Sequence, residues 1–364
     1  MQRKGLLLVG VMVALLATST LAQNVTLPNA ASPLASASQQ VGITEIHIEY
    51  SRPSVRGRSI WGNLVQWDMI NLGFGTAEKS PWRAGANENT KFTVSHDVQI
   101  EGKSLPAGTY GFFVAVQEDG SATLIFSQNS TSWGSYFYDP TEDVLRVDIQ
   151  SEEISHVETL MYSFPEVSAN YAVVALDWEK KRFPFKVSVD VPEVVIANGK
   201  NELRNTTGFN WQGPYSLAQY AMANNTHLEE AMGWAQTAAG MQPNFQTLSL
   251  LGTMQSMQGM DSESSETMEK AMEMGNALQI HQYGRQLIGQ GKAEEALEAF
   301  EYNAKKHPDT WPVNYGLARG YSALGKYKKA ASYLEKALEN APNEPNRQAI
   351  QANLEKLNNG EDIN

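Results

Sequence analysis

The sequence predicts a multidomain β + α protein, with an N-terminal antiparallel β-sandwich followed by a C-terminal α-helical solenoid. Two observations carry this prediction. Short segments of alternating apolar and polar residues follow one another between residues 39 and 191. In the last part of the chain, one pattern recurs at an offset of 34, so that Gly291, Ala296 and Pro308 return as Gly325, Ala330 and Pro342. A length of 364 residues leaves room for both parts.

The first 22 residues have the layout of a secretory signal peptide. Two basic residues precede an apolar run from Leu6 to Leu16, and small residues occupy positions −3 and −1 of a cleavage site after Ala22. The apolar run is shorter than the about 20 residues of a membrane span. We therefore expect cleavage near Ala22/Gln23 and a periplasmic or secreted protein without a membrane span. Residues 23–38, rich in Asn, Ala, Ser and Pro, are expected to form a flexible leader.

Composition excludes several classes of function. The net charge of −12 and the absence of a long Lys/Arg run argue against nucleic acid as a partner, because a phosphate backbone repels such a chain. The chain has no cysteine, which excludes disulfides, thiol catalysis and cysteine-based metal sites. No histidine pair has metal-ligand spacing such as His-x-His or HExxH. We expect neither a cofactor nor a metal.

Residues 39–191 are predicted to form the sandwich. Ile43 to Tyr50 alternates apolar and polar residues with the period of a half-buried strand. Pro106 and Gly108 mark a turn before the next strand, and residues 118–121 look like a hairpin turn. Eight or nine short strands of this kind favour an antiparallel sandwich or a flattened barrel. The expected strands cover residues 43–50, two within 91–100, 110–116, 123–126, 144–149, 158–164, 171–178 and 183–191.

Four blocks of this region resemble the signature blocks of the DUF2911 family: residues 51–58 (SRPSVRGR), 82–90 (WRAGANENT), 105–110 (LPAGTY) and 143–147 (DVLRV). The resemblance covers about residues 31–190. It implies a secreted protein of a family that occurs mainly in Bacteroidetes and has no established function. The family joins its first two blocks by a shorter Pro-Tyr-Gly-type link, which a longer loop replaces here.

Strand alternation stops near residue 191, and residues 192–215, with a turn at Asn198-Gly199, are expected to link the two parts. From Ser216 onward, apolar residues have helical spacing, and helical repeats are predicted over residues 216–358. The repeat is clearest at 277–310 and 311–344.

These repeats resemble tetratricopeptide repeats, since they combine the period of 34 with a Gly at the turn between helices, an Ala in the second helix and a Pro before the next unit. Gly permits the tight turn, Ala lets the paired helices approach, and Pro ends the unit. The resemblance implies that the helical part binds a protein or a peptide.

The repeat register gives a candidate protein-binding groove. First-helix positions that line the inner groove of such repeats fall on Leu278, His281, Arg285, Ile288, Tyr315, Arg319 and Ser322. Arg285 and Arg319 are 34 residues apart and should project to equivalent places. With His281 and Tyr315, the two guanidinium groups could clamp a carboxylate of a peptide. Alternatively, both arginines form salt bridges with glutamates inside the array.

A second candidate site lies in the irregular stretch between the first strands. Its members combine guanidinium, indole, amide and carboxylate groups, which suit stacking on and hydrogen bonding to a sugar or a small anion. Alternatively, they form a buried polar network that holds a long loop in place. The candidate residues are Arg52, Arg56, Arg58, Trp61, Trp82, Arg83, Asn87 and Glu88.

The sequence thus predicts a non-catalytic binding or scaffold protein of the cell envelope, whose repeats hold a protein partner and whose sandwich docks a second ligand. The alternative is an enzyme that acts on an envelope glycan or ester, with its site in the Arg52–Glu88 region. Such an enzyme requires two carboxylates or a nucleophile–base pair in one pocket. A third reading makes the sandwich purely structural. The sequence nominates no catalytic residue.

Overall fold

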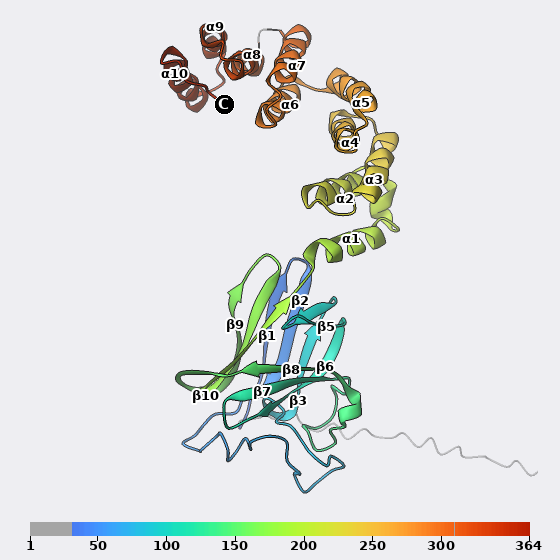
Figure 1. Cartoon of the computed structure of the whole chain (residues 1–364), viewed down its shortest axis with the longest axis vertical. Helices are drawn as coiled ribbons and strands as arrows, with labels where there is room; N and C mark the ends of the chain where they lie inside the picture. The colour runs from blue at the N-terminus through green and yellow to red at the C-terminus, as the bar shows by residue number, and fades with distance from the viewer. Residues whose placement is uncertain (1–30, 309) are drawn as a thin grey trace, which may run out of the picture. The chain divides into compact units, whose positions relative to one another are not determined.

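The computed structural model describes residues 31–308 and 310–364. The signal peptide expected over residues 1–22 lies outside the described residues. The chain divides into two compact units with the boundary between Val189 and Asp190. We call them the β unit and the helical unit, and Figure 1 shows strands in the first and helices in the second. A β-sandwich followed by an α-solenoid confirms the predicted fold class.

The β unit consists of two antiparallel sheets. The larger sheet has the strand order β1-β2-β3-β6-β7-β8, and the smaller has the order β5-β4-β10-β9. A short 3₁₀ helix, η1 (Pro140–Glu142), precedes β8. The strands are β1 (Leu34–Val41), β2 (Thr44–Ser51), β3 (Ala86–Val94), β4 (Val98–Ile100), β5 (Lys103–Leu105), β6 (Gly108–Val116), β7 (Ser121–Ser127), β8 (Asp143–Gln150), β9 (Glu152–Val167) and β10 (Tyr171–Ser188).

A cluster of phenylalanines joins the two sheets. Phe92, Phe112 and Phe126 come from neighbouring strands of the larger sheet, and Phe185 comes from β10 of the smaller one. All four are fully buried, and their ring centroids lie 5.1 to 6.4 Å apart. These are distances at which tilted and edge-to-face aromatic pairs stabilise a core.

The flexible leader predicted for residues 23–38 is wrong from Leu34 onward. Leu34–Val41 forms the edge strand β1, which pairs with β2 from Leu34↔Ser51 to Val41↔Thr44. Most of its side chains are small or polar and are exposed or half-buried. Since an edge strand is held by backbone hydrogen bonds to one neighbour, it does not need the apolar alternation from which strands are predicted.

The last two strands are longer than expected. Residues 171–188 form one continuous strand, β10, where two were predicted, and the break falls at a bulge near Glu179, whose φ is +53°. A β-bulge admits an extra residue and bends a strand without ending it. The bulge follows Trp178, a residue that matters for the site described below.

The helical unit begins with α1 and the 3₁₀ helix η2, followed by four helix pairs and a final helix. In each of the last three pairs, a glycine with φ between +70° and +77° makes the turn between the helices. The helices are α1 (Val191–Glu202), η2 (Thr206–Phe209), α2 (Gln212–Ala223), α3 (Leu228–Met241), α4 (Phe245–Met257), α5 (Asp261–Met274), α6 (Ala277–Gly289), α7 (Ala293–Lys306), α8 (Trp311–Ala323), α9 (Tyr327–Glu339) and α10 (Glu344–Asn358).

The linker predicted over residues 192–215 is wrong, because α1 occupies its first half. Asp190 caps this helix by accepting a hydrogen bond from the backbone N–H of Glu193, and a proline lies in the first turn. Gly199, read as part of a turn, lies inside α1, where a Cβ would come within 2.4 Å of the Leu217 side chain. The glycine therefore permits close packing of α1 against α2 and does not end the helix.

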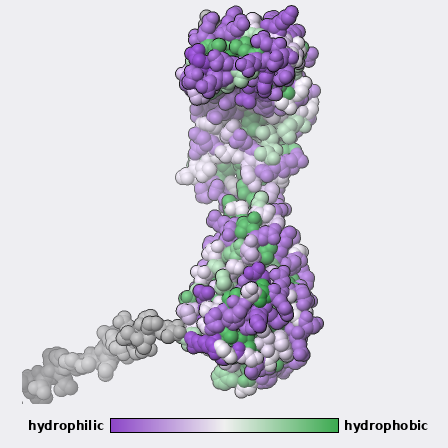
Figure 2. All heavy atoms as spheres, turned by 90° about the vertical axis from the view of Figure 1, so that its left-hand side faces the viewer, coloured by the Kyte–Doolittle hydropathy of each residue, from purple (hydrophilic) through white to green (hydrophobic). Residues whose placement is uncertain are grey.

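The face of the molecule in Figure 2 is mainly polar, and its apolar residues form small separate areas. Singly exposed apolar residues are normal on a protein surface. Within the described residues, none of the helices is both long and apolar enough to span a bilayer.

Candidate functional site

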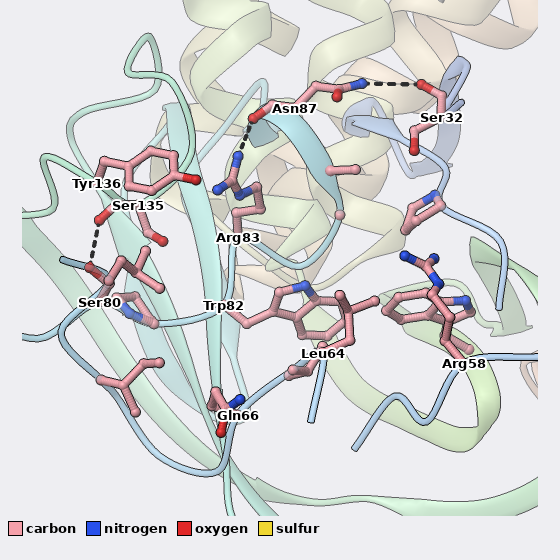
Figure 3. Close-up of a pocket in the computed structure, with 18 of the residues that line it drawn as sticks. Ser32, Arg58, Leu64, Gln66, Ser80, Trp82, Arg83, Asn87, Ser135 and Tyr136 are labelled. Atoms are coloured by element: carbon pink, nitrogen blue, oxygen red, sulfur yellow. Dashed lines mark hydrogen bonds between the residues drawn. The ribbon is translucent and has the colours of Figure 1, made fainter. Parts of the chain in front are cut away.

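A cavity of about 450 Å³ lies in the β unit, beside the irregular stretch between β2 and β3. Figure 3 shows Arg83 and Arg58 on two sides of the Trp82 indole, with Leu64 and Gln66 below it. The volume is within the range of pockets that hold small molecules.

Five of the candidate residues from this stretch line the cavity, namely Arg56, Arg58, Trp82, Arg83 and Asn87. Arg52 and Glu88 are not among the lining residues. The Arg52 Nε donates to the carbonyl of Leu160 at 2.9 Å, which ties the loop to β9. Glu88 is exposed, and its Oε2 lies 3.5 Å from the Ser51 hydroxyl.

Arg83 is held at the cavity by a hydrogen bond and by contact with an aromatic ring. Its Nη1 donates to the Asn87 carbonyl at 2.5 Å, and its guanidinium lies 5.1 Å from the centre of the Tyr136 ring. Gly134 leaves room for the group, since a Cβ there would lie 2.2 Å from Arg83 Cζ. Asn87 adopts φ of +59°, a conformation that asparagine tolerates better than most residues. These local features fix the position of the guanidinium.

Arg58 and Arg56 reach the cavity from the loop that follows β2. Arg58 donates from Nε to the Val55 carbonyl at 3.0 Å and from Nη2 to the Ser54 carbonyl at 2.6 Å. Arg56 donates from Nη2 to the Ala31 carbonyl at 3.0 Å. These bonds go to backbone carbonyls, which carry no charge, so they orient both guanidinium groups without neutralising them.

Tryptophans form one wall of the cavity. Trp82 is bound to β6 by two backbone hydrogen bonds with Val114 and stacks on Trp178 of β10, with centroids 5.8 Å apart and 17° between the planes. Trp61 packs edge-on against both rings at 5.8 and 6.1 Å. The sequence did not point to Trp178, which lies in a strand with ordinary apolar patterning and far from the loop in the chain.

The lining residues do not form the arrangement that a glycan- or ester-cleaving enzyme requires. Among the described residues that line the cavity, the only carboxylate is Asp68, and there is no histidine. Asp68 Oδ1 accepts from Gln117 Nε2 at 3.2 Å. Ser80 is buried and donates to the carbonyl of Ser135 at 2.9 Å, so its hydroxyl has no base beside it in this part of the structure.

In the helical unit, the predicted groove residues form a stacked His281–Tyr315 pair and two arginines in unlike environments. His281 is 5% exposed and stacks on Tyr315 at 6.0 Å between α6 and α8. Arg285 is exposed. Arg319 is half-buried, lies 4.8 Å from the Tyr315 ring centre, and donates to the Ile363 carbonyl and Asn364 Oδ1 at 3.2 and 3.3 Å. The two guanidinium groups therefore do not occupy equivalent environments.

The segment after α10 occupies the positions expected to receive a peptide. Ser322 donates to Asp362 Oδ1 at 2.5 Å, and its Oγ accepts from the backbone N–H of Ile363 at 3.2 Å. Ile363 is 6% exposed and packs into the core of the last repeats. Near Arg319 and Ser322, residues of the chain itself thus take up the hydrogen bonds that a ligand would use.

Burial lowers the pKa of His281 to about 4, and the positive charge of Arg319 adds to this effect. In the unfolded chain the pKa returns to about 6.5. Between pH 6.5 and 4 the unfolded state therefore binds a proton that the folded state does not, and the free energy of unfolding decreases as the pH is lowered through this window. We expect His281 to lower the free energy of unfolding of the helical unit by about 3 kcal/mol across this window.

Urea unfolding followed by the helical circular-dichroism signal measures this effect. His281→Gln, which cannot titrate, should lose less stability between pH 6.5 and 4 than the parent chain. Equal losses in the two proteins would show that His281 is not the group responsible.

A groove that the sequence did not nominate lies between the first helices α2, α4 and α6, with a volume of about 340 Å³. Its lining contains amide, hydroxyl and aromatic side chains and no charged residue: Tyr215, Gln219, Met222, Phe245, Gln246, Ser249, Leu250, Thr253, Gln279, Gln282, Tyr283 and Gln286. The spacing of Gln279, Gln282 and Gln286 was a usable signal, since residues three and four apart share a helix face.

Family comparisons match the two units separately. A model of the DUF2911 family, described as a protein of unknown function, matches residues 32–187, and a tetratricopeptide-repeat model matches residues 287–354. Both resemblances expected from the sequence are confirmed. A comparison with curated proteins gave no match.

The chain is also similar to solved repeat structures. The C-terminal part of a tetratricopeptide repeat-containing protein from Cytophaga hutchinsonii is 16% identical, and the match covers 46% of this chain and 70% of that chain with a TM-score of 0.33. PilF of Pseudomonas aeruginosa is 20% identical over 41% of this chain and 69% of that chain, with a TM-score of 0.29. A MamA protein is 18% identical over 41% and 82%, with a TM-score of 0.30.

Proposed function

We propose that the chain is a non-catalytic binding protein of the cell envelope whose helical unit holds an extended peptide segment of a partner protein. Tetratricopeptide repeats are stacked helix pairs, and repeat arrays of this kind use their extended inner surfaces to bind other proteins. The observation that carries the finer proposal is the uncharged, glutamine-lined groove between α2, α4 and α6.

The chemistry of this groove suits a peptide backbone. A glutamine carboxamide offers two N–H donors and one carbonyl acceptor, so it can pair with both the C=O and the N–H of an extended chain. Gln219, Gln246, Gln282 and Gln286 come from three successive first helices and are all exposed. Since no charged group lines the groove, we expect it to favour segments without charge at the contacting positions.

Aromatic residues in the same groove give a place for apolar side chains of the peptide. Tyr215, Phe245 and Tyr283 are half-buried, so each presents part of its ring to the groove. Tyr and Phe carry much of the binding energy in protein interfaces. A segment that alternates small polar and apolar residues matches both features.

The compartment is part of the proposal. The basic, apolar and small-residue order of residues 3–22 supports export from the cytoplasm, and the absence of cysteine is compatible with any redox environment. Fractionating cells that express the full chain and sequencing the N-terminus of the exported form tests this. A mature chain that begins near Gln23 is expected, and an uncleaved cytoplasmic chain would contradict it.

Peptide selection tests the groove directly. Peptides that bind a protein consisting of residues 23–364 are selected from a random display library. Their dissociation constants are then measured by fluorescence anisotropy. The paired change Gln282→Glu and Gln286→Glu should weaken the binding of these peptides by about tenfold or more, because two carboxylates, which cannot donate, would face the peptide carbonyls in place of amide N–H donors.

The matched control is the paired change Gln348→Glu and Gln351→Glu, which introduces the same two charges at exposed residues of α10 outside this groove. It should bind the selected peptides as the parent does. Peptides whose affinity is unchanged by the paired groove variant, or is changed equally by the control, would exclude the groove as the site.

A further inference from the structure

The cavity of the β unit concentrates positive charge in an acidic protein. Arg56, Arg58 and Arg83 line it together with a single carboxylate, Asp68, although the whole chain carries a net charge of −12. Like charges that line one cavity repel one another, and a bound anion relieves this repulsion. The composition of the lining therefore favours an anionic occupant.

Within residues 31–308 and 310–364, these guanidinium groups form no ion pair with a carboxylate. The arginines that form ion pairs within the described residues are Arg146, Arg182 and Arg347. Each guanidinium has five N–H donors. Arg83 uses one of them to bind a backbone carbonyl, and Arg58 uses two. Several charged donors at the cavity thus remain for a ligand. Of the three arginines, Arg56 should contribute least to binding an anion, because the carboxylate of Glu158 lies nearby and accepts a hydrogen bond from the Arg56 backbone N–H.

A buried donor at the same cavity also lacks an acceptor. Trp178 lines the cavity and is 1% exposed, yet its indole N–H has no hydrogen-bond partner among the described residues. An orphaned buried donor is costly and is rare in folded proteins. This N–H is enclosed by the protein, so the ligand is argued from the guanidinium groups: they are all donors and favour a group with several acceptor oxygens and no need to donate.

Part of the wall is apolar. Leu64, Val65, Ile70 and Pro81 line the cavity beside the Trp82 ring. These side chains offer nothing to a hydrated inorganic ion, but they do suit the hydrocarbon or planar body of an organic molecule. The arginines thus favour an anionic group at one end of a ligand, and the apolar side chains favour an organic body at the other end.

We propose that the β unit binds a small organic anion, in which a carboxylate or phosphate group meets Arg58 and Arg83 and an apolar or planar body lies against Trp82 and Leu64. Guanidinium groups match the oxygens of both acids with paired hydrogen bonds. The site is separate from the peptide groove of the proposed function, and either can fail without the other.

Four probes of related shape separate the parts of this proposal. Phenyl phosphate and benzoate carry the two acids on the same ring, benzyl alcohol carries the ring without charge, and inorganic phosphate carries the charge without the ring. Binding to residues 23–364 is measured by calorimetry and by tryptophan emission, since Trp61, Trp82 and Trp178 lie at or next to the cavity. Phenyl phosphate or benzoate should bind, and whichever binds more tightly identifies the acid. The tighter of these two probes should bind at least about tenfold more tightly than benzyl alcohol or inorganic phosphate.

Variants assign the binding to the cavity. Arg58→Gln should lower the affinity for the tighter-binding probe by about tenfold or more. The double variant Arg58→Gln with Arg83→Gln should abolish measurable binding. Arg58 is exposed and bonds only to nearby carbonyls, so its variant should keep the melting temperature of the parent. Gly134→Ala keeps every charge but displaces the Arg83 guanidinium, and should also weaken the probe.

Arg204→Gln, at an exposed residue of the helical unit, makes the same change in net charge and should leave probe binding unaltered. No binding of either acid, equal binding of benzyl alcohol, or binding that survives the double arginine variant would each overturn the proposal. If inorganic phosphate binds as tightly as phenyl phosphate, the organic body contributes nothing to binding, and that part of the proposal is wrong.

Discussion

Replacing Phe300 with alanine should destabilise the helical unit by about 3–5 kcal/mol, the range found for fully buried aromatic residues. Phe300 of α7 is 0% exposed and lies between α6 and α8. Its ring fills a space that three glycines leave open: a Cβ at Gly284, Gly316 or Gly320 would lie 2.4 to 3.0 Å from a ring atom. Because these three glycines have no side chain that could move into the space, the cavity left by alanine should collapse only in part.

Chemical unfolding followed by the helical circular-dichroism signal measures this loss. Phe300→Leu should cost less than Phe300→Ala, since it leaves a smaller cavity. The control is Phe209→Ala, the same substitution at a residue that is 86% exposed, which should change stability by no more than about 0.5 kcal/mol. Losses of similar size at Phe209 and Phe300 would contradict the packing described for the repeats.

Replacing Trp178 with alanine should destabilise the β unit by about 3–5 kcal/mol. Trp178 is 1% exposed and stacks on Trp82 while contacting Trp61. Trp178→Phe keeps much of the ring contact and removes an indole N–H that has no acceptor among the described residues. It should therefore cost much less than alanine, because the lost group contributes no hydrogen bond.

Thermal unfolding followed by near-ultraviolet circular dichroism reports on these rings. Trp133→Ala, at a residue that is 55% exposed, is the matched control and should leave the transition almost unchanged. If Trp178→Phe proves as damaging as Trp178→Ala, the indole N–H has a partner in solution, which would contradict the unsatisfied donor described here.

The repeats were predictable from the sequence because their determinants are local and periodic. Gly291 and Gly325 both adopt positive φ at the turn between paired helices, and Ala296 and Ala330 are both fully buried where those helices meet. Spacing alone reveals such a pattern. The β1 strand and α1 were missed for the opposite reason, since one is a polar edge strand and the other contains a glycine required by tertiary packing.

The candidate sites could be predicted only in part. Arg58, Trp82 and Arg83 stand out in one short stretch, and the structure brings them to one cavity. Trp178 does not stand out, since only the pairing of sheets places it beside Trp82. In the repeats, the 34-residue offset predicts where Arg319 lies along its helix but not that residues 363 and 364 already engage it. Contacts between distant segments are set by tertiary structure, which periodicity does not report.

The most direct test of the proposed function is site-specific photo-crosslinking in the cell that makes the protein. The photoreactive amino acid p-benzoylphenylalanine is placed at the position of Gln282 in the groove or, in a matched chain, at the position of Gln351 on α10. Irradiation should give a discrete crosslinked partner protein from position 282, competed by a selected peptide, and none from position 351. Equal crosslinking from both positions, or a partner captured only from position 351, would contradict peptide binding in the glutamine-lined groove.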